Sequence, residues 1–281
     1  MQTLIIRFRV LTLFTVLATF LVSCSTTKPS HPTLQATLWV QNAAEFDALN
    51  QQAYNTAQIY LQDAIDDKNW TASVEQDGQD VTALPTAIIL DIDETILDNS
   101  PFQARMIERQ TGFDPVEWNK WAQEGQADAL AGAVTLTQKA AELGVTVFYV
   151  TNRDAVTKEA TRKNMAALGF PLAENVDVIL LNGERENWTS SKVERRKFIA
   201  ADYRIIMLFG DDLNDFLPAK DMTQEKRDAL VAQNAANWGK KWFILPNPIY
   251  GSWDQALTNF DRNLTDKEKE QILKNRLKTK Q

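Results

Sequence analysis

The chain has 281 residues, of which 44% are hydrophobic and 24% are charged, and its formal net charge is -7. This is ordinary globular composition, enough for one sizeable domain with an elaboration, and the negative charge argues against a nucleic-acid polymer as partner. The only histidine is His31 and the only cysteine is Cys24. An intrachain disulfide is therefore excluded, and catalysis has to come from carboxylates, lysine, hydroxyl groups and an oxygen-liganded ion.

The first residues have the pattern of a secretory signal. A basic start is followed by an apolar run over residues 10–22, which is too short for a comfortable membrane span. The residues LVSC, which end at Cys24, resemble a bacterial lipobox. The resemblance implies a signal peptide over residues 1–23, a lipid on Cys24 and a tether over residues 24–33, and Ser25 favours the outer membrane. A plain cleaved signal or a short uncleaved anchor are the alternatives.

Apolar periodicity then predicts alternating helices and strands. Apolar steps of three or four residues indicate an amphipathic helix from Trp39 to about Asp66. Short β-branched runs predict strands over residues 86–90, 145–150, 176–181, 204–209 and 241–245. Helical patterns cover residues 131–143 and 154–168, and a glycine ends each of them. Continuous apolar strands that alternate with helices predict an α/β fold with a parallel sheet covered on both faces.

One stretch of about 35 residues does not follow this alternation. Residues 98–132 contain FDPVEWNKWAQEG, a helical piece that places Trp118 and Trp121 on one face. We interpret this stretch as a cap inserted over the C-terminal edge of the sheet.

Polar side chains follow the strands at the points where they end. They are Asp91 and Asp93 after the first strand, Thr151 and Asn152 after the second, Asp211 and Asp215 after the fourth, and Lys192 in the helix before that strand. Open parallel sheets bind ligands outside the carboxyl ends of their strands. Carboxylates, a hydroxyl and an ammonium at one edge suit phosphoryl transfer assisted by a hard divalent cation.

Four motifs in order resemble a known family. ILDIDETILDNSP, FYVTNR, the lysine of SSKVERR and GDDLNDF resemble the haloacid dehalogenase (HAD) superfamily. More narrowly, they resemble its class C bacterial acid phosphatases, which include outer-membrane lipoprotein 5'-nucleotidases. WVQNAAEFDALNQQAYNTA and PNPIYGSWDQAL are also similar to that group. The resemblance implies a HAD-like Rossmannoid parallel sheet flanked by helices over residues 34–281, with a small, mainly helical cap and an N-terminal helix.

The resemblance also implies a role for each polar residue. Asp91 would be the nucleophile that forms an aspartyl-phosphate, and Asp93 would be the general acid and then the general base. One Mg²⁺ would be held by Asp91, the backbone carbonyl of Asp93 and Asp211, and other divalent ions could replace it. A strand-end acid pair that caps a helix is the structural alternative for Asp91 and Asp93.

The remaining roles concern phosphate and substrate. Thr151 and Lys192 would bind phosphate oxygens, Asn152 would add a backbone N–H, and Asp215 would orient metal-bound water or Lys192. The alternatives are a helix N-cap for Thr151 and a solvated helix lysine for Lys192. For Glu94 we favour a structural role.

Two aromatic residues are candidates for substrate stacking. Trp118 and Tyr250 could sandwich a flat group such as a nucleobase, with ordinary packing as the alternative. We expect Trp121 and Trp253 to lie in the core.

The expected function is a metal-dependent phosphomonoesterase of the outer membrane, anchored by the lipid on Cys24. Its substrates would be small phosphate esters, foremost nucleoside 5'-monophosphates. A broad-specificity acid phosphatase is the alternative within this class, and a non-catalytic binding lipoprotein or a receiver-like domain are the alternatives outside it. The sequence leaves the oligomeric state open, so an oligomer is possible.

Overall fold

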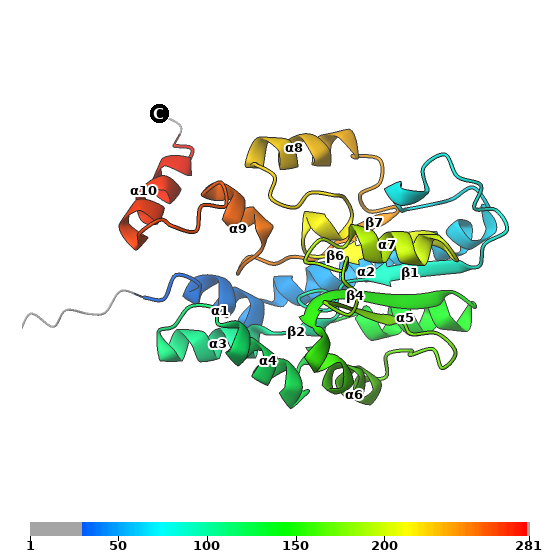
Figure 1. The fold of residues 1–281 in the computed structure, drawn as a ribbon, viewed down its shortest axis with the longest axis horizontal. Coiled ribbons are helices and arrows are strands. Elements are labelled where there is room, and N and C mark those ends of the chain that lie inside the picture. Colours follow the sequence, from blue (N-terminus) through cyan, green and yellow to red (C-terminus); the bar gives the residue numbers. More distant parts are fainter. Residues whose placement is uncertain (1–29, 280–281) are drawn as a thin grey trace, which may run out of the picture. The chain divides into compact units, whose positions relative to one another are not determined.

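Five parallel strands form the centre of the fold in the computed structural model, which describes residues 30–279 (Figure 1). In chain order they are β1 (Thr86–Leu90), β4 (Thr146–Asp154), β5 (Ile179–Asn182), β6 (Arg204–Gly210) and β7 (Trp242–Ile244). Their order in the sheet is β5-β4-β1-β6-β7, and every neighbouring pair is parallel. The predicted α/β class with a parallel sheet is therefore confirmed.

The central strands are buried on both faces, which is why they read as continuous apolar runs. Every residue of β6 is buried, and so are residues 87–90 of β1. A strand in this position needs side chains that pack on both sides of the sheet, and β-branched residues such as Ile88 and Ile205 meet that need.

Helices cover both faces of the sheet. The connections β1→β4 and β5→β6 cross the sheet in opposite directions, so right-handed crossovers place α5 (Ala133–Glu142) and α7 (Val193–Ala200) on opposite faces. Further helices are α2 (Ala44–Asp66), α6 (Lys158–Leu168), α8 (Gln224–Gln233), α9 (Ser252–Leu257) and α10 (Asp266–Arg276), with short 3₁₀ turns η1 (Val74–Gln76), η2 (Ala155–Thr157) and η3 (Leu213–Asp215).

The N-terminal helical segment differs from its predicted form. It consists of two helices, α1 (Leu34–Asn42) and α2, because Ala43 is extended with φ -84° and ψ 122°. The break lets α1 pack against α3 while α2 packs against α5. The prediction of one helix from Trp39 to Asp66 was therefore wrong, and no glycine or proline marks the break.

The segment between β1 and α5 carries the helical piece that we predicted there and a second helix that the sequence analysis did not predict. α3 (Ser100–Arg109) and α4 (Pro115–Glu124) lie between two short strands, β2 (Leu97–Asp98) and β3 (Asp128–Ala129), which pair antiparallel. α4 begins at Pro115 because the carboxylate of Asp114 accepts hydrogen bonds from the backbone N–H groups of Val116 (2.7 Å) and Glu117 (3.2 Å). α4 contacts α6 and β4, so this segment lies against the edge of the sheet where β4 ends.

The predicted signal peptide and the lipidation residue Cys24 lie outside the described residues. None of the helices between residues 30 and 279 combines the length and the apolar character that crossing a bilayer requires.

Candidate active site

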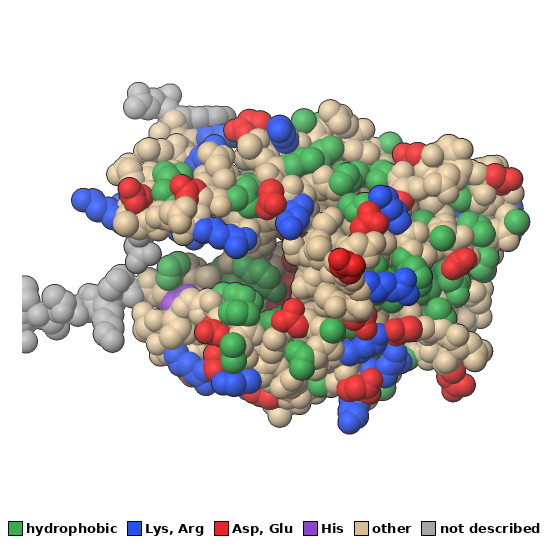
Figure 2. All heavy atoms as spheres, in the orientation of Figure 1, with side chains coloured by type: hydrophobic (Ala, Val, Ile, Leu, Met, Phe, Trp, Pro, Cys, Tyr) green, Lys and Arg blue, Asp and Glu red, His purple; other side chains and the backbone are tan. Residues whose placement is uncertain are grey.

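The sheet order explains why distant residues meet at one edge. β1 lies between β4 and β6, so Asp91 after β1 has Thr151 on one side and Asp211 on the other. The backbone N–H of Asp91 donates to the carbonyl of Phe209 (3.0 Å) and continues the ladder between β1 and β6. Thr151 lies within β4, where the pairing with β5 shifts its register between Val150 and Asp154. Figure 2 shows that the face drawn there is hollowed between the α9–α10 segment and the α1, α3 and α4 helices, with hydrophobic side chains inside the hollow.

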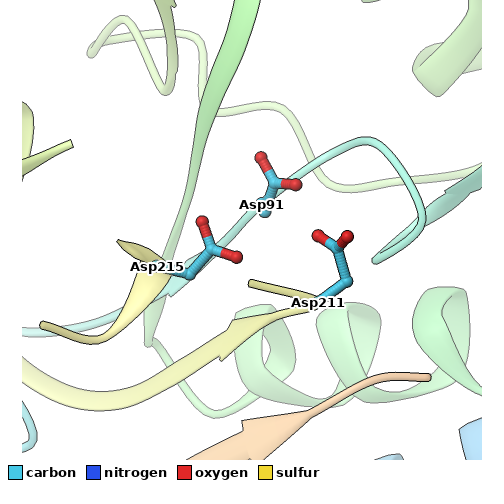
Figure 3. Close-up of side chains that lie close together, drawn as sticks. All are labelled: Asp91, Asp211 and Asp215. Atoms are coloured by element: carbon cyan, nitrogen blue, oxygen red, sulfur yellow. The ribbon is translucent and has the colours of Figure 1, made fainter. Parts of the chain in front are cut away.

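Three carboxylates converge at this edge (Figure 3). Asp91, Asp211 and Asp215 each offer an oxygen, and these oxygens lie within 4.8 Å of one another. A β-carbon on residue 210 would lie only 2.1 Å from Oδ2 of Asp215, so only glycine at position 210 leaves room for this carboxylate. Carboxylate oxygens in this arrangement are a donor set that can hold a hard divalent cation. The structure thus adds Asp215 to the metal-binding candidates. The orienting role that the sequence suggested for it stays a prediction, and its contact with Lys192 agrees with that role.

Lys192 is the cation at the centre of these acids. It is buried in the N-cap position of α7, and its Nζ donates to the carboxylate of Asp91 and to Oδ1 of Asp215 (2.5 Å). Burial alone would lower the pKa of Lys192, but Asp215 and Asp91 outweigh it and raise that pKa. Lys192 is therefore protonated and is not the solvated lysine of the structural alternative.

Burial also raises the pKa values of the three carboxylic acids. It raises the pKa of Asp91 to about 7, with Lys192 opposing the rise and Asp215 and Asp93 adding to it. Burial likewise raises the pKa of Asp211, with the charges of Asp215 and Asp91 adding to the effect, and it raises the pKa of Asp215 against the opposing charge of Lys192. A bound cation would therefore stabilise this cluster of buried carboxylates.

Asp93 has a different set of partners. Its Oδ1 accepts from Nε of Arg153 (2.9 Å) and from Nδ2 of Asn99 (2.9 Å), and it lies 2.8 Å from Nη2 of Arg153. Among the described residues, its Oδ2 accepts only a long hydrogen bond from the hydroxyl of Thr151 (3.3 Å). These contacts fix Oδ1 of Asp93 and leave Oδ2 able to form a further hydrogen bond.

The two phosphate-binding candidates of β4 are held by a buried arginine. Arg195 donates to the carbonyl of Thr151, to Oδ1 of Asn152 (2.7 Å) and to the carbonyl of Thr189 (2.7 Å). Burial lowers the pKa of Arg195 to about 10, so it stays charged near neutral pH. Thr151 is buried, whereas Asn152 is exposed and donates to the carbonyl of Ser190 (3.1 Å).

The aromatic candidates occupy two different settings. The hydroxyl of Tyr250 donates to the buried carboxylate of Glu94, and its partly buried ring packs against the apolar cluster that contains Val40 and Ile249. The partly buried Trp118 meets Phe102 edge-on at 5.2 Å between ring centroids, and the guanidinium of Arg153 lies 5.8 Å from its ring.

The two tryptophans expected in the core differ from one another. Trp121 is buried and packs in the main core cluster. Trp253, at the start of α9, is 37% exposed, and its indole N–H donates to backbone carbonyls of the loop before that helix. The core assignment was therefore wrong for Trp253, which is held by hydrogen bonds to that loop.

Several residues that contact the site were not predicted from the sequence. They are Asn99, Arg153, Arg195, Arg196 and Asn247, and every one of them is hydrogen-bonded to a residue of the site or to its backbone. Asn247, for example, donates to Oδ2 of Asp211 (2.8 Å). All five lie inside the quoted sequence stretches, and Arg195 and Arg196 lie about one turn beyond Lys192. That spacing on one helical face was the available signal.

Comparison with known proteins gives a consistent picture. The model of the HAD superfamily, subfamily IIIB (acid phosphatase) matches residues 18–253. The solved class C acid phosphatase from Bacillus anthracis is 33% identical, and the alignment covers 90% of this chain and 99% of that one. The TM-score is 0.76, and 0.78 for the form with tungstate bound.

More distant relatives align over shorter segments. Acid phosphatase 1 of Solanum lycopersicum is 30% identical over 178 residues, which are 62% of this chain and 60% of that protein. The class B acid phosphatase of Morganella morganii is 25% identical over 189 residues, which are 64% of this chain and 76% of that protein. The match thus spans less than two thirds of the tomato protein. The family model, however, spans most of this chain, and the bacterial structure aligns over nearly its whole length, so the chain belongs to subfamily IIIB of the HAD superfamily, the acid phosphatases.

Proposed function

We propose that this protein is a divalent-metal-dependent phosphomonoesterase that works through an aspartyl-phosphate on Asp91. The observation that carries the proposal is the placement of Asp91 beside the ammonium of Lys192 and the carboxylates of Asp211 and Asp215. A nucleophilic carboxylate next to a fixed cation and a cation-binding cluster suits attack on an anionic phosphate. The tungstate bound to the class C relative supports the proposal, because tungstate is a tetrahedral oxyanion like phosphate.

The reaction proceeds in two displacements. The carboxylate of Asp91 forms a bond to phosphorus while the ester oxygen leaves, and Asp93 gives that oxygen its proton. Asp93 then takes a proton from a water molecule, whose oxygen bonds to phosphorus and releases Asp91. Lys192 and the Thr151 hydroxyl hold phosphate oxygens throughout. Bound at Asp91, Asp211 and Asp215, with the carbonyl of Asp93 as a further oxygen donor, a divalent ion such as Mg²⁺ would offset the negative charge shared by nucleophile and phosphate.

Phosphate release from a nucleoside 5'-monophosphate by the full-length chain in mild detergent tests this proposal. We expect release that requires a divalent ion and falls by at least about 10³-fold in Asp91→Asn. Asp202→Asn is the matched control, because this exposed acid lies just before the opposite end of β6 and its loss should leave the rate unchanged. If the unmodified chain releases no phosphate from this ester or from an aryl phosphate, the binding-lipoprotein alternative replaces the proposal.

The favoured substrate class is the nucleoside 5'-monophosphates. The partly buried rings of Trp118 and Tyr250 support it, because aromatic faces stack on nucleobases with little dependence on base identity. We expect kcat/KM to be about tenfold higher for a nucleoside 5'-monophosphate than for ribose 5-phosphate, and this preference should shrink in Trp118→Leu and in Tyr250→Leu. Tyr250→Phe keeps the ring and should retain the preference. Equal rates on both esters would favour the broad-specificity alternative.

We also propose that a lipid on Cys24 anchors the protein in the outer membrane. The support is the lipobox-like LVSC sequence and Ser25 after it. Mass spectrometry of the mature N-terminus should find the acyl chains on Cys24. Membrane fractionation should place the protein with the outer membrane, and Cys24→Ser should move it to the soluble fraction. A soluble wild-type protein would refute the anchor without affecting the enzymatic proposal.

A further inference from the structure

Asn99 is a fully buried residue in the turn that follows Asp93, just before α3. Its Nδ2 donates to Oδ1 of Asp93 (2.9 Å). Its Oδ1 accepts from the indole N–H of Trp121 (2.8 Å) and from Nη2 of Arg153 (3.2 Å). Because an indole and a guanidinium can only donate, the amide oxygen must face them and the NH₂ must face Asp93. The orientation of the Asn99 side chain is therefore determined by its neighbours.

A second contact holds the backbone around Asn99. The buried carboxylate of Glu94 accepts from the backbone N–H of Asn99 (3.1 Å) and from its Nδ2 (3.4 Å), and it also accepts from the hydroxyl of Tyr250. Glu94 takes the left-handed conformation with φ 55°, which is uncommon for a residue with a β-carbon and costs energy that surrounding contacts must offset. The turn from Asp93 to Asn99 is thus a tightly specified unit and not a mobile loop end.

The consequence for Asp93 is that its two oxygens differ. Oδ1 is fully engaged by Asn99 and Arg153, while Oδ2 has only the 3.3 Å hydrogen bond from Thr151 within residues 30–279. Oδ2 is therefore the oxygen that can hold a proton and pass it to a leaving group. It can then take a proton from the attacking water in the second displacement.

Both anchors of Oδ1 also contact the same cap helix, α4. Trp121, which donates to Asn99, and Trp118, which lies 5.8 Å from the guanidinium of Arg153, are three residues apart on α4. Residues at this spacing share one face of a helix. The position of α4 and the orientation of Asp93 are consequently linked through two side-chain contacts.

We propose that Asn99 is a positioning residue for proton transfer: it holds Asp93 so that Oδ2 serves as the acid and base, and through Trp121 it links that group to the cap helix. This inference rests on the proposed phosphatase function. It predicts a selective defect, because an alkyl leaving group needs the proton from Asp93, whereas a nitrophenolate leaves without one.

The experiment compares kcat/KM of the full-length chain for a nucleoside 5'-monophosphate and for p-nitrophenyl phosphate. In Asn99→Ala we expect a loss of about 30–100-fold with the nucleotide and of less than about threefold with the aryl ester, because a misplaced acid should lose no more than the roughly 10²–10⁴-fold that a general acid contributes. Trp121→Phe keeps an aromatic ring but removes the indole donor, and it should give the same pattern with a loss of about threefold to tenfold. Asn164→Ala is the matched control: Asn164 is another buried asparagine, which donates to the carbonyl of Ala127 (3.0 Å), and its removal should leave the ratio of the two esters unchanged.

The possible outcomes separate this inference from the function on which it rests. Equal losses on both esters in Asn99→Ala would make Asn99 a structural residue only and would overturn the inference. If Asn99→Ala does not fold, Trp121→Phe decides: a shifted ratio supports the inference and an unchanged ratio overturns it. A wild-type chain that hydrolyses neither ester would overturn the proposed function, and this inference with it.

Discussion

The edge of the sheet and the cap helices both contain ion pairs, but in opposite environments. At the edge, the side chains of Lys192, Asp91 and Asp215 are only 4–8% exposed. On the cap, Arg109 and Lys120 both pair with Glu117, and these three side chains are 41–62% exposed. The cap pairs lie on the wall of a pocket of about 660 Å³ between α3 and α4.

The difference shows what burial does to the same chemistry. A surface pair exchanges good hydration for a weak, screened attraction, so it contributes little to stability. A buried pair has lost its hydration, so each member depends on the other, and removing one leaves an uncompensated charge. The buried charges at the edge are therefore poor stabilisers in themselves, but they are fixed in place before substrate arrives, which is what stabilising a phosphoryl group requires.

The largest expected effect comes from removing the buried cation. Lys192→Met keeps an unbranched stem and deletes the ammonium that Asp91 and Asp215 share. We expect phosphate release to fall by about 10³-fold and, in EDTA, the free energy of unfolding to fall by about 3 kcal/mol. Urea unfolding and an activity assay measure the two effects.

The matched control is Lys197→Met on the same helix. Lys197 is exposed and pairs with Glu194 at 2.8 Å, so neither quantity should change measurably. A Lys192→Met protein that kept a tenth of its activity would show that the ammonium does not hold phosphate.

The next largest effect is expected for Arg195, which holds residues of β4 at the edge of the sheet. Arg195 binds the carbonyls of Thr151 and Thr189 and the side chain of Asn152 at once, and a lysine cannot span three acceptors in this way. We expect Arg195→Lys to raise KM for a phosphate ester about tenfold with a smaller change in kcat. Arg162→Lys, in a more exposed pair with Asp177, should leave KM unchanged. An Arg195→Lys enzyme with normal KM would mean that the backbone of β4 holds its shape without this contact.

Buried arginines such as Arg195 also show the limit of what the sequence predicts. The strands and the acids that follow them were predictable, because apolar runs reveal buried strands and parallel strands bring their carboxyl ends together. The burial of Arg195, Arg196 and Arg204 was not. Arg204, for instance, donates to the carbonyls of Ala64, Asp67 and Trp70, which lie more than 130 residues away. A charged side chain can be buried when such acceptors surround it, and no local pattern reports them.

The contribution of Asn99 illustrates the same limit within a recognised motif. The sequence placed it next to the candidate catalytic acids, but its Trp121 partner comes from α4, 22 residues further along the chain. The break between α1 and α2 at Ala43 was missed for a related reason, because packing of α1 on α3 sets it and no residue with unusual backbone preferences does.

The two regions should also differ, by a smaller amount, in how they make the stability of the protein depend on pH and on a metal ion. Burial raises the pKa of Asp91 to about 7 and raises those of Asp211 and Asp215, whereas aspartates in the unfolded chain titrate near about 4. Between these values the folded protein holds protons that the unfolded chain releases, so the stability of the metal-free protein should fall as pH rises from about 4 to about 7.

A divalent ion competes with these protons, so its stabilising effect should grow over the same range. We expect saturating Mg²⁺ to raise the melting temperature by roughly 5–10 °C at about pH 8 and by much less at about pH 5. Differential scanning fluorimetry with Mg²⁺ or EDTA measures this, and Asp211→Asn should reduce the shift. The same Mg²⁺ shift at both pH values would indicate that the ion does not bind at these carboxylates.

The smallest expected effect comes from the cap, and it tests whether burial is the variable that separates the two regions. Arg109→Gln combined with Lys120→Gln removes both cations that pair with Glu117, which is twice the number removed by Lys192→Met. We nevertheless expect the melting temperature to change by less than about 1 °C and kcat/KM by less than about twofold, because solvent already screens these charges. A tenfold loss of kcat/KM at unchanged melting temperature would instead mean that the cap charges attract or bind the anionic substrate. In that case exposed charges would serve the same reaction as buried ones, and the number of cations near the substrate path, more than their burial, would decide the rate.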